Sequence, residues 1–250
     1  MFSGKVAIVT GGTRGIGLAT VEYLARHGAS VAFSSRKVDV CEQVEARLKA
    51  EGLSCIAVPG HAAVEADVAR LVDATVAAFG GIDIVVANAG INPVFDPATE
   101  VADAVWNKVM DTNVAGPLRL ARHALPHVAG RGGAMVCVSS VNARVGMAGS
   151  GAYGVSKAAL EQLVRLLAVE WGPKGVRING VAPGTTATDM IRSLRDVPAF
   201  MDKIVQGTPL RRIADPADVA AVIAFMGSDA ARHVTGQTLV VDGGQTITRG

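Results

Sequence analysis

The chain has 250 residues, of which 50% are hydrophobic and 18% are charged. This composition supplies enough apolar surface for a large core and excludes a disordered chain. The formal net charge of +2 is too small to indicate a nucleic-acid partner. No apolar run reaches the ~20 residues of a membrane span, the first residues lack the pattern of a signal peptide, and the 3 cysteines are irregularly spaced. We therefore expect a soluble, cytoplasmic protein.

Short apolar runs alternate with longer helical patterns along the chain. The expected helices include Gly17–His27, Val64–Phe79 and Ala102–Leu125. Because each short run is apolar throughout, both faces of each strand are expected to be buried, as in a parallel sheet. Repeated β-α-β units predict a single α/β domain over residues 1–250 with a doubly wound parallel sheet of about seven strands, the Rossmann fold. The expected strands are Val6–Thr10, Val31–Ser34, Cys55–Val58, Ile82–Ala87, Ala134–Val138, Val176–Val181 and Thr238–Val241.

The segment Thr186–Leu210 interrupts this alternation. It separates the sixth strand from a helix that begins near Asp215, and it is rich in proline, methionine and phenylalanine. Long insertions in compact domains often form lids or binding loops. We expect a substrate-loop insertion at about residues 186–210, with a surface excursion of no functional interest as the alternative.

A glycine-rich turn follows the first strand. Gly11 can take a turn conformation that is closed to other residues, Gly15 lets the backbone approach a pyrophosphate, and Gly17 lets the helix pack closely on the strand. The helix N-terminus offers free N–H groups and the positive end of its dipole to phosphates. The pattern predicts a dinucleotide site, although a purely structural turn has the same spacing. Its residues are Gly11, Thr13, Arg14, Gly15, Ile16 and Gly17.

The end of the second strand indicates which dinucleotide binds. In such folds an acidic residue there binds the ribose 2′-hydroxyl, but this chain has Ser35, Arg36 and Lys37 after Ser34. Small hydroxyls followed by cations suit a 2′-phosphate, and Arg14 adds a third cation. We predict NADP(H) as the cofactor, bound by Ser35, Arg36 and Lys37. The alternative is that the two cations belong to a solvated loop.

Residues suited to proton transfer lie further along the chain. Tyr153 and Lys157 are four residues apart in a helical segment, so they share one face, one turn apart. A nearby ammonium, helped by a positive nicotinamide ring, lowers a tyrosine pKa from its usual value near 10. Such a tyrosine protonates an alkoxide or accepts a hydroxyl proton. Ser140, at a strand end, is placed to donate a hydrogen bond to the substrate oxygen.

Together these motifs resemble the short-chain dehydrogenase/reductase family over essentially the whole chain, from Lys5 to Gly244. The resemblance implies a catalytic tetrad of Asn113, Ser140, Tyr153 and Lys157. Ser140 is preferred to Ser139 because it stands thirteen residues before Tyr153, the usual family spacing. The resemblance further implies that Lys157 holds the nicotinamide ribose hydroxyls and that Asn113 helps a water to relay protons toward it.

The resemblance also implies further cofactor contacts. Asn88, Ala89 and Gly90 would lie along the adenosine-ribose side, and the nicotinamide carboxamide would meet Pro183, Gly184, Thr186 and Thr188. Two positions depart from the family pattern. His61, followed by Ala62, stands where an aspartate usually touches adenine, which alters that contact, and residue 87 is Ala where the family often has Asn. Neither departure touches the expected chemistry.

Within this family, the motifs look most like NADP-dependent carbonyl reductases of the retinal-reductase type. We therefore expect reduction of a ketone or aldehyde to an alcohol, or the reverse. The alternatives are a 3-oxoacyl-carrier-protein reductase, a steroid or sugar dehydrogenase, or a non-catalytic NADP(H)-binding regulatory protein. A mainly apolar substrate pocket is indicated by Val94, Phe95, Met147 and Met190. Arg144 and Arg192 are the cations that could clamp a small acid.

Two further features concern metals and assembly. His123 and His127 are four apart, but Pro126 lies between them and no third ligand is evident, so no metal site is expected. The segment Tyr153–Trp171 is apolar on more than one face, so it must bury a second side within the subunit or against another. Because the family assembles through this helix and the preceding one, the resemblance implies a homotetramer, with a dimer as the second choice.

Overall fold

The computed structural model describes residues 1–191 and 198–248. Within these ranges, a 7-stranded sheet has the strand order β3-β2-β1-β4-β5-β6-β7, and every neighbouring pair is parallel. The chain builds outward from β1 to β3 and then returns to β4, so the order reverses between β1 and β4. The predicted doubly wound parallel sheet is confirmed. The strands are β1 (Val6–Thr10), β2 (Ser30–Ser34), β3 (Cys55–Ala57), β4 (Ile84–Ala87), β5 (Ala134–Val138), β6 (Arg177–Pro183) and β7 (Thr238–Val241).

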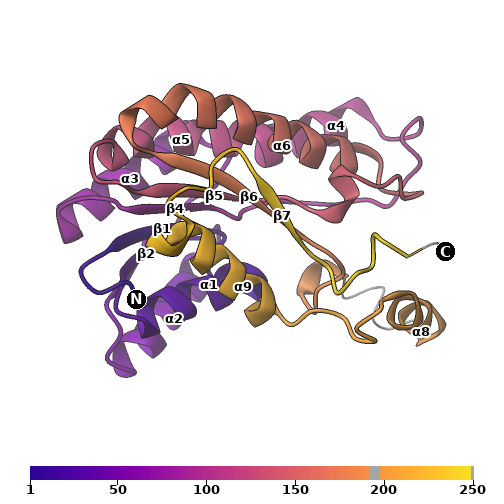
Figure 1. Cartoon of the computed structure of the whole chain (residues 1–250), viewed down its shortest axis with the longest axis horizontal. Helices are drawn as coiled ribbons and strands as arrows, with labels where there is room; N and C mark the ends of the chain where they lie inside the picture. The colour runs from indigo at the N-terminus through magenta and orange to yellow at the C-terminus, as the bar shows by residue number, and fades with distance from the viewer. Residues whose placement is uncertain (192–197, 249–250) are drawn as a thin grey trace.

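Helices cover both faces of the sheet (Figure 1). One layer contains α1 (Gly15–Arg26), α2 (Val38–Ala50) and α9 (Pro216–Gly227). The opposite layer contains α3 (Glu65–Phe79), α5 (Gly116–Val128) and α6 (Gly151–Trp171). Figure 1 shows α8 (Pro198–Gly207) at one end of the molecule, beside the C-terminal segment rather than in either layer.

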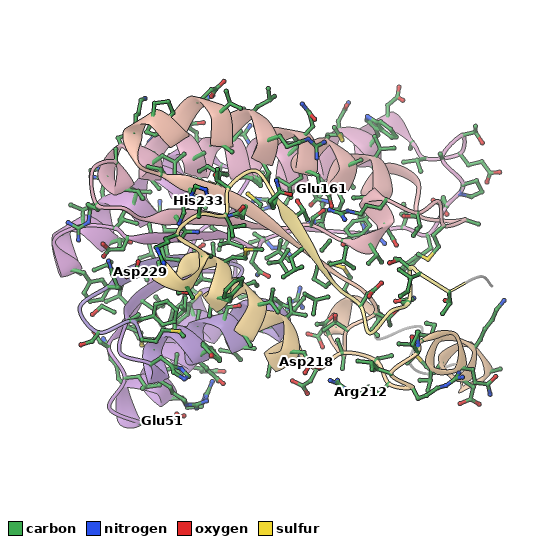
Figure 2. The ribbon with its side chains drawn as sticks, viewed as in Figure 1. Glu51, Glu161, Arg212, Asp218, Asp229 and His233 are labelled. Carbon is green, nitrogen blue, oxygen red and sulfur yellow. The ribbon has the colours of Figure 1, made fainter. Side chains whose placement is uncertain are left out.

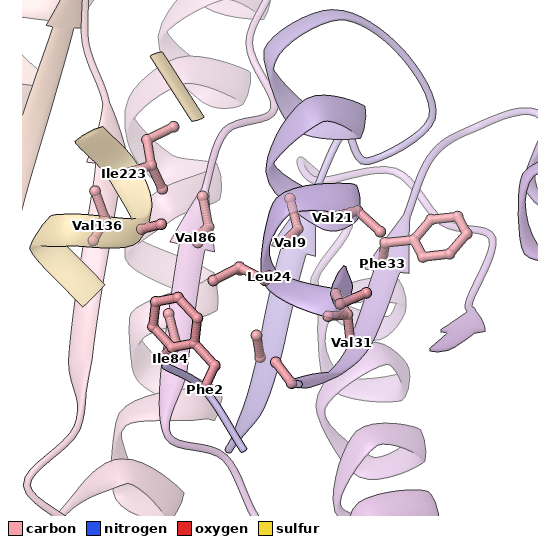
Figure 3. Packing of buried hydrophobic residues seen from close by; sticks show 14 of the residues in the cluster. Phe2, Val9, Val21, Leu24, Val31, Phe33, Ile84, Val86, Val136 and Ile223 are labelled. Carbon is pink, nitrogen blue, oxygen red and sulfur yellow. The ribbon is translucent and has the colours of Figure 1, made fainter. Parts of the chain in front are cut away.

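The uniformly apolar strands are explained by these two helical layers. Val9, Val86 and Val136 point toward α1 and α9 and pack with Leu24 and Ile223 (Figure 3). Their chain neighbours in the same strands point the other way, toward α3, α5 and α6. Each fully buried aliphatic side chain of this kind contributes about 1.5–3 kcal/mol relative to an exposed one. Since both faces are buried, an unpaired polar side chain would be destabilising within the sheet. β4 and β5 have none, and the buried Asn179 of β6 is hydrogen-bonded to Val234 O and Gln237 N.

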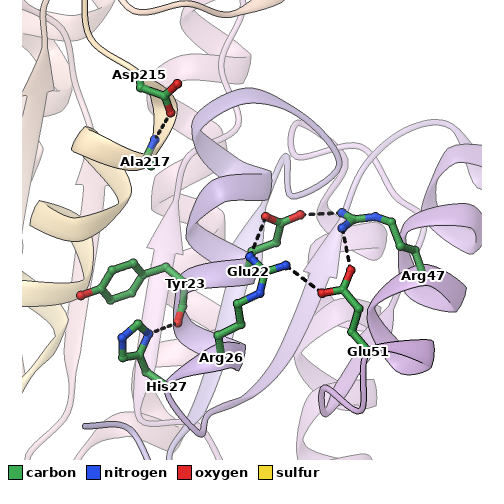
Figure 4. A network of polar contacts seen from close by, with 8 residues as sticks. All are labelled: Glu22, Tyr23, Arg26, His27, Arg47, Glu51, Asp215 and Ala217. Atoms are coloured by element: carbon green, nitrogen blue, oxygen red, sulfur yellow. Dashed lines mark hydrogen bonds and ion pairs between the residues drawn. The ribbon is translucent and has the colours of Figure 1, made fainter.

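A network of four charged side chains links α1 to α2 (Figure 4). Arg26 bonds Glu22 within α1 at 3.3 Å and Glu51, just after α2, at 2.7 Å. Arg47 bonds Glu22 across the two helices at 2.5 Å and Glu51 at 3.1 Å. Each arginine bonds one carboxylate in its own part of the chain and one across the interface, so the network joins α1 to the end of α2. Because all four side chains are partly exposed, each pair contributes at most about 1 kcal/mol.

The predicted helix Ala102–Leu125 is wrong as a continuous α-helix. The structure has α4 (Asp103–Met110), a π-helical turn η1 (Asp111–Ala115), and then α5. Asn113 lies at the centre of this turn, and a π-turn inside a helix often marks a functional site. Hydrophobic periodicity cannot reveal such an insertion, because it changes the turn by a single residue.

The insertion predicted at residues 186–210 contains a short helix η4 (Asp189–Ile191) and α8. Arg192, one of the two cations considered for an acid clamp, belongs to residues 192–197, which lie outside the described residues. The first helix also begins two residues earlier than expected, at Gly15.

Candidate active site

The predicted site residues follow the carboxyl ends of neighbouring strands. The glycine turn follows β1, Ser35–Lys37 follow β2, His61 and Ala62 follow β3, Asn88–Gly90 follow β4, and Ser139 and Ser140 follow β5. Because all these strands are parallel, their carboxyl ends share one edge of the sheet. The structure therefore assembles these segments beside the point at which the strand order reverses.

The glycine turn is as tight as the sequence predicts. Gly11 and Gly15 have φ values of 68° and 52°, in the left-handed region that favours glycine. A Cβ atom on Gly17 would lie 2.1 Å from the Gly11 carbonyl oxygen, closer than any real contact. No other residue fits at position 17 without moving α1 away from β1.

Asn88 holds this turn from the side of β4. Its Nδ2 donates to the carbonyl oxygens of Thr10 and Gly11 at 2.9 and 3.2 Å. The Thr10 hydroxyl oxygen in return accepts from the backbone N–H groups of Asn88 and Ala89, both at 3.1 Å. The family resemblance gave Asn88 a place along the adenosine ribose, but in this structure its side-chain donors support the turn.

The first turn of α1 is suited to an anion. No side chain of the described residues caps this helix, whose N-cap is Arg14, so its first N–H groups are available to a phosphate. Arg36 and Lys37 are exposed at the end of β2, and neither forms an ion pair within the described ranges. Backbone donors and unpaired cations of this kind are suited to bind phosphate groups.

Arg14 itself has a partner that the sequence did not single out. Its guanidinium lies 3.3 Å from the carboxylate of Asp189 in η4, and both side chains are more than half exposed. The methyl group of Thr188 lies 3.1 Å from the place of a Cβ on Gly15. The insertion after β6 therefore borders the glycine turn directly.

The remaining predicted cofactor residues form local turns. The His61 backbone N–H donates to the Asp67 carboxylate at 2.8 Å, and its ring Nδ1 accepts from Ala63 N at 3.0 Å. The Thr186 hydroxyl donates to the Gly184 carbonyl at 3.0 Å, next to Pro183 at the end of β6. Sequence reasoning identified His61 as a departure, and the structure shows that its ring stabilises its own turn.

Tyr153 and Lys157 are both buried on α6, one turn apart as predicted. The Lys157 Nζ lies 5.7 Å from the centroid of the Tyr153 ring and donates to the Val138 carbonyl at the end of β5, at 2.7 Å. A Cβ on Gly90 would lie 3.3 Å from this ammonium and 3.4 Å from Asn113 Oδ1. The absence of a side chain at Gly90 therefore leaves the space between Lys157 and Asn113 open.

The π-turn orients the Asn113 amide toward the other predicted catalytic residues. Its Oδ1 accepts from Ile91 N at 2.8 Å, and its Nδ2 donates to Ile91 O and to the Ser156 hydroxyl, both at 3.0 Å. Ser156 donates in turn to the Tyr153 carbonyl at 2.7 Å. The structure thus links Asn113 through Ser156 to the backbone of Tyr153, with the Lys157 ammonium 5.7 Å from the Tyr153 ring. Ser140 also acts on Tyr153, because its side chain lowers the pKa of the phenol.

In the protein alone, the pKa of the Tyr153 phenol lies above its usual value, so Lys157 by itself does not produce the predicted lowering. Burial raises the pKa of the phenol, and the nearby Ser140 side chain opposes this only in part. Lys157 does not lower the phenol pKa, because its ammonium lies over the Tyr153 ring and bonds the Val138 carbonyl rather than the Tyr153 hydroxyl.

Lys157 is itself strongly perturbed. Burial lowers its pKa from 10.5 to about 8. Burial raises the pKa of the neighbouring Cys137 thiol to about 12, so this thiol is neutral at pH 8. Burial therefore decides the pKa of Lys157.

Sequence reasoning missed several residues that contact this network. The Ser140 hydroxyl oxygen accepts from Asn142 N at 3.2 Å, and the Asn142 side chain donates to the Ser150 hydroxyl at 3.1 Å. Ser139, the serine not chosen, donates to Glu161 at 3.1 Å. Glu161 was detectable as a carboxylate four residues after Lys157 on the same helix face.

In the described part of the chain, His, Cys, Asp and Glu side chains do not gather in a group of three or more suited to a metal ion. His123 instead lies 2.6 Å from a Glu65 carboxylate oxygen. None of the helices in the described ranges has the length and apolar character needed to cross a bilayer.

The fold and the assembled edge define a dinucleotide-binding oxidoreductase architecture, and comparison with known proteins narrows it. Residues 11–246 match the sequence model of the family described as "Enoyl-(Acyl carrier protein) reductase". The chain is 40% identical over 246 residues to the human protein "Dehydrogenase/reductase SDR family member 4", covering 96% of this chain and 87% of that one. The relative of the same name from Caenorhabditis elegans is 39% identical over 248 residues, covering 97% and 95%. The chain therefore belongs to the short-chain dehydrogenase/reductase family and is an oxidoreductase.

Solved structures agree with this assignment. A gluconate 5-dehydrogenase from Burkholderia cenocepacia, solved in complex with NADP and tartrate, has a TM-score of 0.94 at 31% identity, covering 99% of this chain and 97% of that one. A short-chain type dehydrogenase/reductase from Mycobacterium ulcerans has a TM-score of 0.93 at 36% identity, covering 100% and 92%.

The lowered pKa of Lys157 predicts a pH-dependent stability. Between pH 8 and 10.5 the unfolded lysine is protonated while the folded one is neutral, so the unfolded state binds more protons and stability rises with pH. Lys157→Met removes this contribution. Urea unfolding of both proteins measures the difference in free energy of unfolding, variant minus unsubstituted protein. This difference should fall by about 3 kcal/mol from pH 7 to pH 10.5. A difference that stays constant across this range would contradict the assignment.

Proposed function

We propose that this protein is an NADP(H)-dependent carbonyl reductase or alcohol dehydrogenase, with residues 1–250 forming one dinucleotide-binding and catalytic domain. The observation that supports this most directly is the burial of Tyr153 and Lys157 one turn apart, with Asn113 linked to the Tyr153 backbone through Ser156 and with Ser140 lowering the phenol pKa. NADP(H), when bound, supplies or accepts the hydride. The protein's own residues then handle the proton and the charge on the substrate oxygen.

Tyr153 is the proposed general acid and base. Because burial raises its pKa, the hydroxyl keeps its proton at neutral pH and donates it as an alkoxide develops on the substrate. Ser140 donates a hydrogen bond to the same substrate oxygen. In the reverse direction, Tyr153 first gives up its own proton to the water relay, and the phenolate then accepts the proton of the substrate hydroxyl. The Lys157 ammonium, charged below about pH 8, holds ribose hydroxyls, while Asn113 orients a water that relays protons.

The proposed cofactor site combines the glycine turn with the ends of the other strands. The uncapped first turn of α1 binds the pyrophosphate, and Ser35, Arg36 and Lys37 bind the 2′-phosphate. Since Arg14 pairs with Asp189, its contribution to the 2′-phosphate requires that it leave this carboxylate. The other residues of the site are Thr13, Ile16, His61, Ala62, Asn88, Ala89, Gly90, Pro183, Gly184, Thr186 and Thr188.

The substrate is proposed to be a mainly apolar ketone or aldehyde. Phe95, Met147 and Met190 expose 42%, 46% and 41% of their surface, which leaves them available to an apolar ligand. Arg144 does not support a clamp for a small acid, because its guanidinium is engaged by Glu161 and by the Thr238 carbonyl. Because Arg144 is engaged in this way, we favour a neutral carbonyl substrate over the sugar acids that the likeness to the gluconate 5-dehydrogenase suggests.

Replacing Tyr153 with Phe tests the reaction. The variant lacks the proton donor, so kcat should fall at least about 10²-fold, while NADPH binding stays within about twofold because the ring still fills its site. Turnover is measured on a panel of ketones and aldehydes, with Tyr23→Phe on α1 as the matched control. Near-normal turnover by the Tyr153 variant would refute the assignment. Tight NADPH binding with no reduction by the unsubstituted protein would favour a non-catalytic regulatory role.

The cofactor preference is tested at the end of β2. Removing both cations with Arg36→Ala and Lys37→Ala should raise the KM for NADPH at least tenfold, because a charge-assisted bond contributes about 1.5–3 kcal/mol, and leave the KM for NADH nearly unchanged. Lys108→Ala removes an exposed cation elsewhere and should change neither. Equal or better rates with NADH in the unsubstituted protein would overturn the NADP(H) proposal.

We also propose a homotetramer, with a dimer as the second choice. Val155, Leu166 and Val169 on α6 expose 46%, 51% and 77% of their surface, and Leu118 on α5 exposes 37%. Leu166→Glu with Val169→Glu should reduce the assembly size measured by light scattering, because two charges would be buried at a contact between subunits. Val64→Glu, at another exposed valine, should leave it unchanged. A monomeric unsubstituted protein at micromolar concentration would contradict the proposal.

A further inference from the structure

A second buried charge lies one turn beyond Lys157 on α6. The Glu161 side chain is only 8% exposed, and Figure 2 shows it beneath α6 on the side toward β7. Its neighbours Leu160 and Val164 belong to the apolar core. Because a buried carboxylate is destabilising unless it is paired and hydrogen-bonded, the contacts that Glu161 makes indicate why it is there.

Two residues of the loop after β5 bond this carboxylate. The Ser139 hydroxyl donates to Glu161 Oε1 at 3.1 Å, and Arg144 Nε lies 3.3 and 3.2 Å from its two oxygens. Arg144 also donates from Nη2 to the Thr238 carbonyl of β7 at 2.9 Å. One carboxylate therefore holds both ends of the segment from Ser139 to Arg144, and the arginine attaches that segment to the last strand of the sheet.

Ser140 lies inside the segment that is held in this way. Its hydroxyl oxygen accepts from Asn142 N within the short helix η2 (Val141–Ala143), and the Asn142 carbonyl lies 3.0 Å from the place of a Cβ on Gly154, next to Tyr153. The Ser140 side chain lowers the pKa of the Tyr153 phenol. If either end of the segment moved, the Ser140 hydroxyl would lose its direction toward the phenol. Misplacement of a reacting group by about 1 Å is enough to slow a reaction up to about 10²-fold.

We propose that Glu161 is a positioning residue, which fixes the Ser140 hydroxyl against Tyr153 by binding Ser139 and Arg144 together. This inference rests on the proposed function, since it assigns Glu161 a part in placing a group that the proposed reaction uses. A residue that only stabilises the fold would affect turnover whether or not Ser140 is present. The proposed role of Glu161 predicts an effect on turnover that requires Ser140.

The experiment compares Glu161→Gln in two backgrounds, the unsubstituted protein and Ser140→Ala. The glutamine still accepts from Ser139 but loses the charge that holds Arg144. With Ser140 present, kcat should fall about tenfold while the NADPH dissociation constant stays within about twofold. With Ser140 absent, the same substitution should lower kcat less than about twofold further. Glu170→Gln, the same change at an exposed position of α6, should leave kcat unchanged in both backgrounds.

Arg144→Met provides a second, independent variant, since its side chain is 40% exposed and its removal does not depend on refolding around Glu161. It should reproduce the kcat loss of Glu161→Gln, and the double variant should lose no more than either single one. Equal losses with and without Ser140, or no loss in either single variant, would overturn the inference. Absence of NADPH-dependent turnover in the unsubstituted protein would instead overturn the proposed function.

Discussion

The site depends on one costly arrangement, a lysine ammonium held in the protein interior between α6 and the end of β5. Taking an ammonium out of water costs several kcal/mol, and the 2.7 Å bond from Lys157 to the Val138 carbonyl offsets only part of this. The desolvation cost that is not offset destabilises the charged form of Lys157, and this lowers its pKa. Such a group is tolerated only where the surrounding fold leaves it no other position, and here the buried face of α6 and the sheet edge provide that constraint.

The same helix combines this charge with an otherwise apolar surface. Leu160, Val164 and Leu167 are buried in the core formed with α3 and α5, while Ser156, Lys157 and Glu161 are buried on the part of α6 that faces the strand ends. Polar groups at such positions oppose the local pattern of a core helix, and natural sequences keep these conflicts mainly where function requires them. The polar residues of α6 are therefore the part of the helix that its packing does not explain.

Features that depend on residues close together in the sequence were predictable, and features that depend on distant contacts were not. The strands were predictable because burial on both faces leaves an uninterrupted apolar run, and the Gly11–Gly17 turn was predictable because its constraints are local. The π-turn at Asn113 was not, because one inserted residue does not disturb the hydrophobic period. The raised Tyr153 pKa of the protein alone was not predictable, because spacing along a helix gives proximity to Lys157 but reveals neither the burial of the phenol nor the competing bond from Lys157 to Val138.

Arg144 illustrates why a cation in the sequence does not define a ligand. Considered alone, it was an option for binding a small acid, but its partners, Glu161 and Thr238, lie 17 and 94 residues away along the chain. These contacts convert it from a ligand-binding group into a tie between the loop after β5, α6 and β7. Since Arg36 and Lys37 remain without ion-pair partners among the described residues, available positive charge lies at the end of β2. Unpaired cations at this position are suited to the phosphate that the proposed cofactor would bring there.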